Sequence, residues 1–256
     1  MSRVLTVSGL HLAAGARALV QGVSLSLRRG QVLAMLGRSG GGKSLTTLAL
    51  LDLLPAGVSR LGGEVSLDGM VLDRAGQAAL RGATLGYVQQ APRAGFNPLV
   101  SIGRHFEETL AREGLRGGAA RRRMLELLRD VGFEAPDSVP RLYPSQLSGG
   151  MLQRAMIALT LCRNPAFLLA DEPTTDLDLV VQAQILDLLD RLVAERGIGL
   201  LLVTHDLSVV ARLADEVAVM EDGTIVEQQP VRSFFDTPRH PRSRALLAAH
   251  RALYES

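Results

Sequence analysis

The stretch VLAMLGRSGGGKS at residues 32–44 decides the fold that we predict for this chain. It begins with an apolar run, Val32–Leu36, which is typical of a strand buried on both faces of a parallel sheet. The remainder fits the pattern G-x-x-x-x-G-K-[ST], in which glycines let successive backbone N–H groups wrap around a phosphate. We therefore predict a phosphate-binding loop formed by Gly37, Arg38, Ser39, Gly40, Gly41, Gly42, Lys43 and Ser44.

The residues after this loop, Leu45–Leu51, predict a helix whose N-terminus faces the bound anion with roughly half a positive charge. In loops of this pattern the lysine, here Lys43, reaches the β- and γ-phosphates, and the hydroxyl of Ser44 holds Mg²⁺. Lys43 is also the single lysine among 28 basic residues, and it stands where a compact, mobile ammonium is useful. The alternative is a glycine-rich turn without a ligand, but the flanking strand and helix are the context that the motif requires.

The composition is that of a chain able to build a large core, with 256 residues of which 47% are apolar. A net charge of only +2 gives no general argument for nucleic-acid binding. The lone cysteine, Cys162, excludes an internal disulfide framework, and we expect it in the core. We find no signal-peptide core and no apolar stretch of the ~18 residues that a membrane span needs.

A second apolar strand, Phe167–Ala170, ends in two adjacent carboxylates, Asp171 and Glu172. At the carboxyl end of a parallel strand beside a phosphate-binding loop, Asp171 is expected to hold Mg²⁺ through water. Glu172 is then the candidate general base that polarises the attacking water. The alternative is that both acids are ordinary surface residues.

Two further polar positions follow the same logic. His205 comes directly after an unbroken apolar strand, Gly199–Thr204, and at that sheet edge it is expected to sense the γ-phosphate rather than serve as a structural histidine. Ser148 is placed to cap a helix that opens with Gly149 and Gly150, so a second helix N-terminus is expected to face an anion, although an ordinary capped helix has the same pattern.

The remaining pattern predicts the order of the elements. Strands are expected at Val4–Val7, Val20–Leu27 and Thr84–Val88, hairpins at Glu64–Leu72 and Val217–Glu227, and helices across Leu99–Tyr143, from the Ser148 turn to Arg163, and across Leu179–Glu195. We thus predict an α/β fold, a P-loop NTPase (RecA-like) core with a mainly parallel sheet, an N-terminal antiparallel β subdomain and an inserted α-helical subdomain.

Taken in order, these motifs resemble the ATP-binding subunits of ABC transporters over essentially the full chain. The resemblance implies a single nucleotide-binding domain at residues 1–230, with the helical subdomain inserted at about 91–165, and a tail at 231–256. It adds Gln90 as the glutamine that contacts Mg²⁺, and a D-loop at Thr175–Asp178. The cofactors implied are ATP and Mg²⁺.

The resemblance also implies an assembly. Two such subunits, identical or not, pair head to tail, and each ATP lies between the loop of one and Ser148, Gly149 and Gly150 of the other. The pair drives two transmembrane permeases that receive cargo from a periplasmic or extracellular binding protein. The expected location is therefore peripheral, on the cytoplasmic face of the cell (inner) membrane.

The predicted C-terminal tail indicates which subgroup of ABC transporters the chain resembles. The segments Phe234–Leu247 and Phe96–Pro98 are similar to those of peptide and nickel importers, and Asp171–Asp178, Ala211–Asp215 and His250–Tyr254 look closest to nickel importers. An equivalent role in a di- or oligopeptide importer stays open. Rivals from other classes are an ABC ATPase acting on nucleic acid or ribosomes, and a regulatory module without turnover.

Two positions depart from the family pattern. The aromatic residue that stacks on adenine is missing unless His11 takes its place, and the usual small residue of the D-loop is Asp176.

Overall fold

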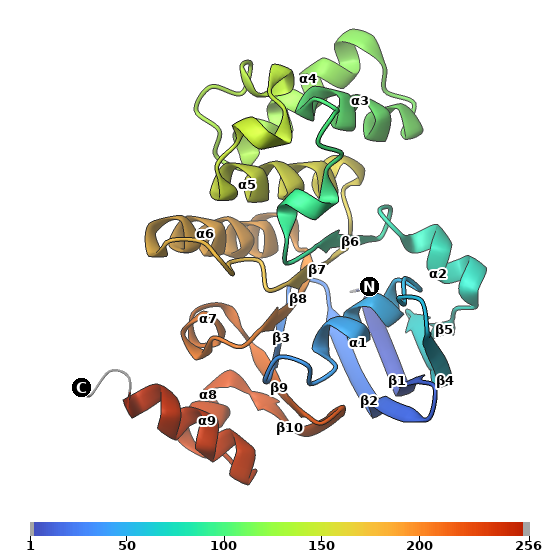
Figure 1. Ribbon diagram of the computed structural model, residues 1–256, viewed down its shortest axis with the longest axis vertical. Helices are drawn as coiled ribbons and strands as arrows, with labels where there is room; N and C mark the ends of the chain where they lie inside the picture. The colour runs from blue at the N-terminus through green and yellow to red at the C-terminus, as the bar shows by residue number, and fades with distance from the viewer. Residues whose placement is uncertain (1–2, 253–256) are drawn as a thin grey trace. The chain divides into compact units, whose positions relative to one another are not determined.

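The computed structural model describes residues 3–252 (Figure 1). These residues divide into two compact units. The first unit comprises residues up to Arg81 together with those from Leu192 onward, and the second runs from Gly82 to Arg191. The limits predicted for the inserted subdomain and the tail remain predictions. Met1, Ser2 and the last residues of the predicted tail, 253–256, lie outside the described residues.

An antiparallel sheet opens the first unit, with the strand order β2-β1-β4-β5. A two-residue turn at Asp68 and Gly69 joins β4 to β5, and their φ angles of 55° and 81° suit the hairpin predicted there. Alternate residues such as Leu5 and Val7 are fully buried, as expected for a sheet with one covered face. The strands are β1 (Val4–Ala14), β2 (Arg17–Arg28), β4 (Val58–Leu67) and β5 (Met70–Val71).

A second group of strands in the first unit surrounds β3. Strand β3 (Val32–Leu36) runs parallel to β8 (Gly199–Thr204) on one side and to β9 (Glu216–Glu221) on the other. Every residue of β3 and β8 is buried, which explains their unbroken apolar sequences. The antiparallel partner of β9 is β10 (Thr224–Pro230), and the helices of this unit are α1 (Lys43–Leu50), α2 (Arg74–Leu80), α7 (Leu207–Leu213), α8 (Val231–Asp236) and α9 (Pro241–Ala252).

The second unit combines a parallel strand pair with a group of helices. Strand β6 (Leu85–Val88) pairs with β7 (Phe167–Asp171), and α3, α4 and α5 pack together in the green to yellow-green part of Figure 1. Cys162 is buried, as predicted. The helices of this unit are α3 (Ile102–Arg112), α4 (Gly117–Asp130) and α5 (Gly149–Thr160), with 3₁₀ turns at Pro92–Gly95, Val139–Arg141, Pro144–Gln146 and Leu161–Arg163. Helix α6 (Leu179–Arg196) begins in this unit, and its residues from Leu192 onward belong to the first unit.

Several elements differ from the sequence prediction. Strand β1 is longer than predicted because Gly9, just beyond the predicted limit at Val7, adopts φ 60° within the pairing rather than ending it. Strand β2 begins at Arg17 rather than Val20. Helix α5 ends at Thr160, and the chain continues as a 3₁₀ turn that Asn164 closes with φ 47°. Helix α2 has no counterpart in the prediction, since its sequence carries no clear apolar period.

Candidate functional site

The predicted phosphate-binding loop leaves the carboxyl end of β3 and enters α1. It lies against the β9–β10 hairpin, so closely that a Cβ on Gly37 would stand 2.4 Å from the carbonyl oxygen of Met220. Gly42 caps α1 with φ 99°, a left-handed conformation that side chains rarely adopt. These two glycines are therefore needed for the shape of the loop.

Lys43 lies folded beneath the loop, with only 4% of the residue exposed. Its Nζ donates to the carbonyl oxygens of Gly37 at 2.8 Å and Arg38 at 2.9 Å. The hydroxyls of Thr46 and Thr47 donate back to Gly42 and Lys43 within the first turns of α1. Ser44 is exposed at the start of this helix, so its hydroxyl is accessible to a ligand of the loop.

His205 lies at the same edge as the phosphate-binding loop, at the carboxyl ends of the parallel strands β3 and β8. Strand β3 is in register with β8, with Leu36 opposite Thr204, so Gly37 and His205 each follow the end of a paired strand. Asp206 then caps α7 by accepting from the backbone N–H of Ser208 at 2.7 Å. His205 is exposed, which suits a residue that meets a ligand at this edge.

The two carboxylates lie at the carboxyl end of β7 in the second unit. Asp171 is buried, and Glu172 has a positive φ of 45°, a conformation uncommon for a non-glycine residue. One oxygen of Glu172 accepts from Nε2 of Gln90 at 3.3 Å and from the hydroxyl of Thr175 at 2.9 Å. The structure thus brings together Glu172 with the predicted Gln90 and a D-loop residue.

Tyr87 is a neighbour of Asp171 that the sequence analysis missed. Its hydroxyl donates to Oδ2 of Asp171 at 3.5 Å. Burial first, and then the Asp171 carboxylate, raise the pKa of the Tyr87 phenol well above its usual range, so the phenol stays protonated and remains a donor. A single polar side chain inside the apolar strand β6 was the available signal.

The turn at Ser148–Gly150 begins α5 in the predicted way. The Ser148 hydroxyl accepts from the backbone N–H of Met151 at 3.3 Å, while Ser148 and Gly149 remain exposed. Gly150 is buried, and a Cβ there would stand 2.3 Å from Val181 of α6. The exposed helix start is therefore set by a close approach between α5 and α6 that only glycine permits.

The sequence of this chain was compared with models of known protein families. The family model described as ABC transporter matches residues 20–175. The chain belongs to the ABC transporter family. The resemblance and the fold class predicted from the sequence are both confirmed.

Relatives within the ABC family match nearly the whole chain. Nickel import ATP-binding protein NikD of Rhodospirillum rubrum is 52% identical over 253 residues, covering 98% of this chain and 96% of the relative. NikD of Pseudomonas putida is 49% identical over 253 residues, covering 99% and 98%. The similarity to NikD proteins therefore extends past residue 175, where the match to the family model ends.

Solved ABC structures share the fold. The protein cbiO1 from Clostridium perfringens, described as part of the ABC transporter complex cbiONQ, superposes with a TM-score of 0.81 at 26% identity and covers 100% of both chains. The ATP-binding cassette MJ0796, solved as a dimer bound to ADP and Pi in a post-hydrolysis state, gives a TM-score of 0.77 at 28% identity, covering 89% of this chain and 99% of that one.

The donor set of this ABC chain suits Mg²⁺ in its chemistry. The predicted ligands are the Ser44 hydroxyl, the Gln90 amide oxygen and the Asp171 carboxylate, all hard oxygen donors of the kind that Mg²⁺ prefers. Among residues 3–252 no group of three or more His, Cys, Asp or Glu side chains is arranged to hold a metal.

None of the helices described in residues 3–252 has the length and hydropathy needed to cross a membrane.

Proposed function

We propose that this chain is the ATP-binding subunit of an ABC importer and hydrolyses ATP to drive nickel uptake through partner permeases. The observation that carries the proposal is the identity of about half of all residues with NikD proteins along almost the full length. The loop, the carboxylates and His205 supply the parts that ATP hydrolysis requires. Cargo specificity lies with the partners.

Each site residue has a role in this proposal. Lys43 and the loop amides hold the β- and γ-phosphates, and His205 contacts the γ-phosphate. Glu172 accepts the proton of the attacking water, with Gln90 and Thr175 holding its carboxylate by the hydrogen bonds described above. Mg²⁺, held by Ser44, Gln90 and Asp171, supplies charge neutralisation at the phosphates when bound. The phosphate-facing residues are Gly37, Arg38, Ser39, Gly40, Gly41 and Gly42.

The working unit in this proposal is a head-to-tail pair of ATP-binding subunits. The exposed Ser148 and Gly149, with Gly150, contribute to the nucleotide held by the neighbouring subunit. The pair binds two transmembrane permeases at the cytoplasmic face of the inner membrane, and a periplasmic or extracellular binding protein delivers the cargo. A dimeric cassette among the similar structures supports the pairing.

Radioactive nickel uptake tests the proposal. Cells in which the gene is deleted should lose nickel accumulation, and the wild-type chain but not Lys43→Ala should restore it. Arg122→Ala, on the exposed face of α4, is the control variant and should restore uptake fully. Loss of di- or oligopeptide uptake with normal nickel accumulation would instead assign the chain to a peptide importer, for which the shared tail pattern is the supporting feature.

A further inference from the structure

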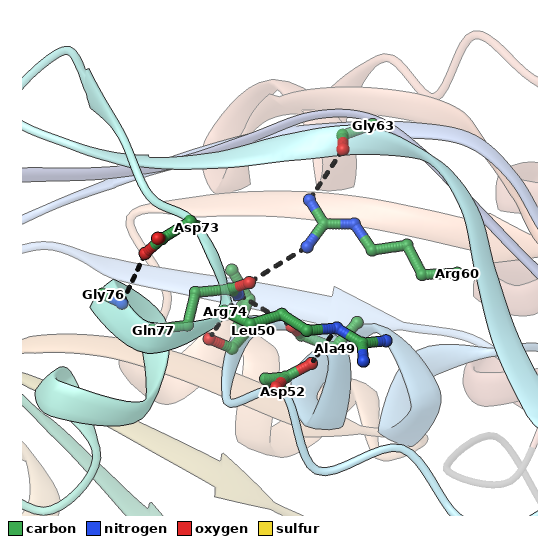
Figure 2. Close-up of polar contacts among 9 residues, drawn as sticks. All are labelled: Ala49, Leu50, Asp52, Arg60, Gly63, Asp73, Arg74, Gly76 and Gln77. Atoms are coloured by element: carbon green, nitrogen blue, oxygen red, sulfur yellow. Dashed lines mark hydrogen bonds and ion pairs between the residues drawn. The ribbon is translucent and has the colours of Figure 1, made fainter.

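Gln77 on α2 is a buried polar residue outside the site described above, with 1% of it exposed. Its side-chain Nε2 donates to the carbonyl oxygens of Ala49 at 3.1 Å and Leu50 at 3.2 Å (Figure 2). Both carbonyls belong to the last turn of α1, the helix that carries Lys43 and Ser44 at its other end. The residue therefore connects α2 to the C-terminus of the phosphate-loop helix.

The carbonyl groups in the C-terminal turn of α1 need hydrogen-bond donors from outside the helix. The last four carbonyl groups of a helix lack N–H donors within it, and α1 has no basic residue in its last turn. The backbone N–H groups of Leu51 and Leu53 donate to the carbonyl of Leu48, and those of Leu51 and Asp52 donate to that of Ala49. The Gln77 amide supplies the side-chain donor at Leu50, where burial keeps water away.

Arg60 of β4 fixes which way the Gln77 amide faces. Its Nη1 donates to Oε1 of Gln77 at 3.1 Å, and its Nη2 donates to the carbonyl oxygen of Gly63 at 2.7 Å. Because a guanidinium only donates, the amide oxygen must face Arg60 and the amide nitrogen must face α1. Figure 2 shows Gln77 between the guanidinium and the end of α1.

Gly63, which accepts from Arg60, lies close against strand β1. Gly63 has φ +90°, and a Cβ there would stand 2.5 Å from the carbonyl oxygen of Gly9 on β1. Gly63 is thus held against the neighbouring strand of the antiparallel sheet. The sheet, Arg60 and Gln77 consequently form a continuous support for the C-terminus of α1.

We propose that Gln77 is a positioning residue of the nucleotide site, which with Arg60 holds the C-terminal end of α1 and so fixes Lys43 and Ser44 at the phosphates. With eight residues, α1 is only about 12 Å long, so a shift at one end displaces the other. The inference rests on the proposed function, because it assumes that the loop binds MgATP.

Equilibrium titration of the full-length chain with a fluorescent ATP analogue tests the role of Gln77. Gln77→Met keeps the length of the side chain and removes the amide, and it should raise the Kd for the Mg²⁺-bound analogue about tenfold, the order expected for losing two buried hydrogen bonds. The half-saturating Mg²⁺ concentration should rise with it, because Ser44 moves with α1.

The matched control is Asp73→Ala on the same helix. Asp73 caps α2 by accepting from the backbone N–H of Gly76 at 2.7 Å (Figure 2). Its loss removes this cap but leaves the hydrogen bonds of Gln77 to α1 in place, so Kd should stay at the wild-type value. Titrations are run well below each variant's thermal midpoint. Equal effects from both variants, or none from Gln77→Met, would overturn the positioning role.

A second variant covers the case in which Gln77→Met does not fold. Arg60→Met leaves the donors of Gln77 in place but removes the contact that orients them, and it should raise Kd by a smaller factor of about three. An unchanged Kd for Arg60→Met would then contradict the proposal. A wild-type chain that does not bind the analogue with Mg²⁺ would contradict the proposed function itself.

Discussion

The side-chain amide of Gln90 donates a hydrogen bond of 3.3 Å to Oε2 of Glu172. Glu172→Gln retains an oxygen that can accept this bond and the one from Thr175, so the site should keep its shape while losing its base. We expect ATP turnover by the assembled transporter to fall at least ~100-fold, in the range typical of general-base catalysis. ATP binding should persist. Steady-state phosphate release measures the first quantity and nucleotide titration the second.

The control for this variant is Thr175→Val, which removes a 2.9 Å hydrogen bond to Glu172 but leaves the carboxylate in place. A decrease of only a few-fold in turnover is expected. Undiminished turnover with Glu172→Gln would refute the assignment of the base.

Lys43 should be irreplaceable by arginine. Its Nζ fits beneath the loop between two carbonyl oxygens, at 2.8 and 2.9 Å, in a position that is 4% exposed. A planar guanidinium is larger and has a fixed fork of donors, so Lys43→Arg should lose ATP binding about as fully as Lys43→Ala. Nucleotide titration of both variants provides the check. Wild-type affinity in Lys43→Arg would show that charge alone suffices.

Replacement by alanine should destabilise the folded chain more at Gly150 than at Gly149. A Cβ at position 150 would lie 2.3 Å from Val181, whereas at position 149 the nearest atom, on Leu177, is 3.5 Å away. Gly150→Ala should therefore lower the free energy of unfolding by about 1–3 kcal/mol through overpacking. Chemical denaturation compares the two variants, and equal stability of Gly149→Ala and Gly150→Ala would contradict the close approach of α5 to α6.

Glu227 should make the stability of the tail depend on pH. Burial opposes ionisation of this carboxylate, but its polar neighbours outweigh burial and lower its pKa. These are the Ser243 side chain and the backbone N–H groups of Arg239 and His240, and the two N–H groups donate to the carboxylate at 2.8 Å. A lowered pKa in the folded state adds stability above the ordinary glutamate pKa of about 4.3, and that stability is lost as the pH falls below it.

Glu227→Gln tests this dependence. The difference in thermal midpoint between wild type and variant should be constant from pH 7 to about pH 5 and shrink as the pH falls from there toward pH 3. Glu195→Gln, on the exposed part of α6, should show no such trend. A difference for Glu227→Gln that stays constant across this range would contradict the role of its charge.

Cys162 should be unreactive in the folded chain. Burial raises the pKa of its thiol to about 12, so at pH 8 almost no thiolate is present. Iodoacetamide at pH 8 should leave the native chain unmodified and alkylate it fully after denaturation, as intact mass will show. Rapid modification of the native chain would place the thiol at the surface.

Much of the fold was predictable because local patterns carry it. The unbroken apolar strands β3 and β8 were predicted with their observed limits, since strands buried on both faces leave no polar positions to obscure them. The loop residues, Asp171, Glu172 and His205 were predicted as site residues because each stands at the end of an apolar strand. Helix α2 was not predicted because its sequence has no clear apolar period. The contact that gives this helix its proposed role, the Gln77 amide at the end of α1, depends on tertiary packing.

The sequence by itself determined the ABC family, the order of the elements and the chemical types gathered at the strand ends, because spacing and residue type are local properties of the chain. Only the tertiary structure decided that Tyr87 meets Asp171, that Gln77 closes the end of α1 and that Gly150 must lack a side chain. Each of these depends on a distance between segments far apart in the sequence, and such distances are set by packing.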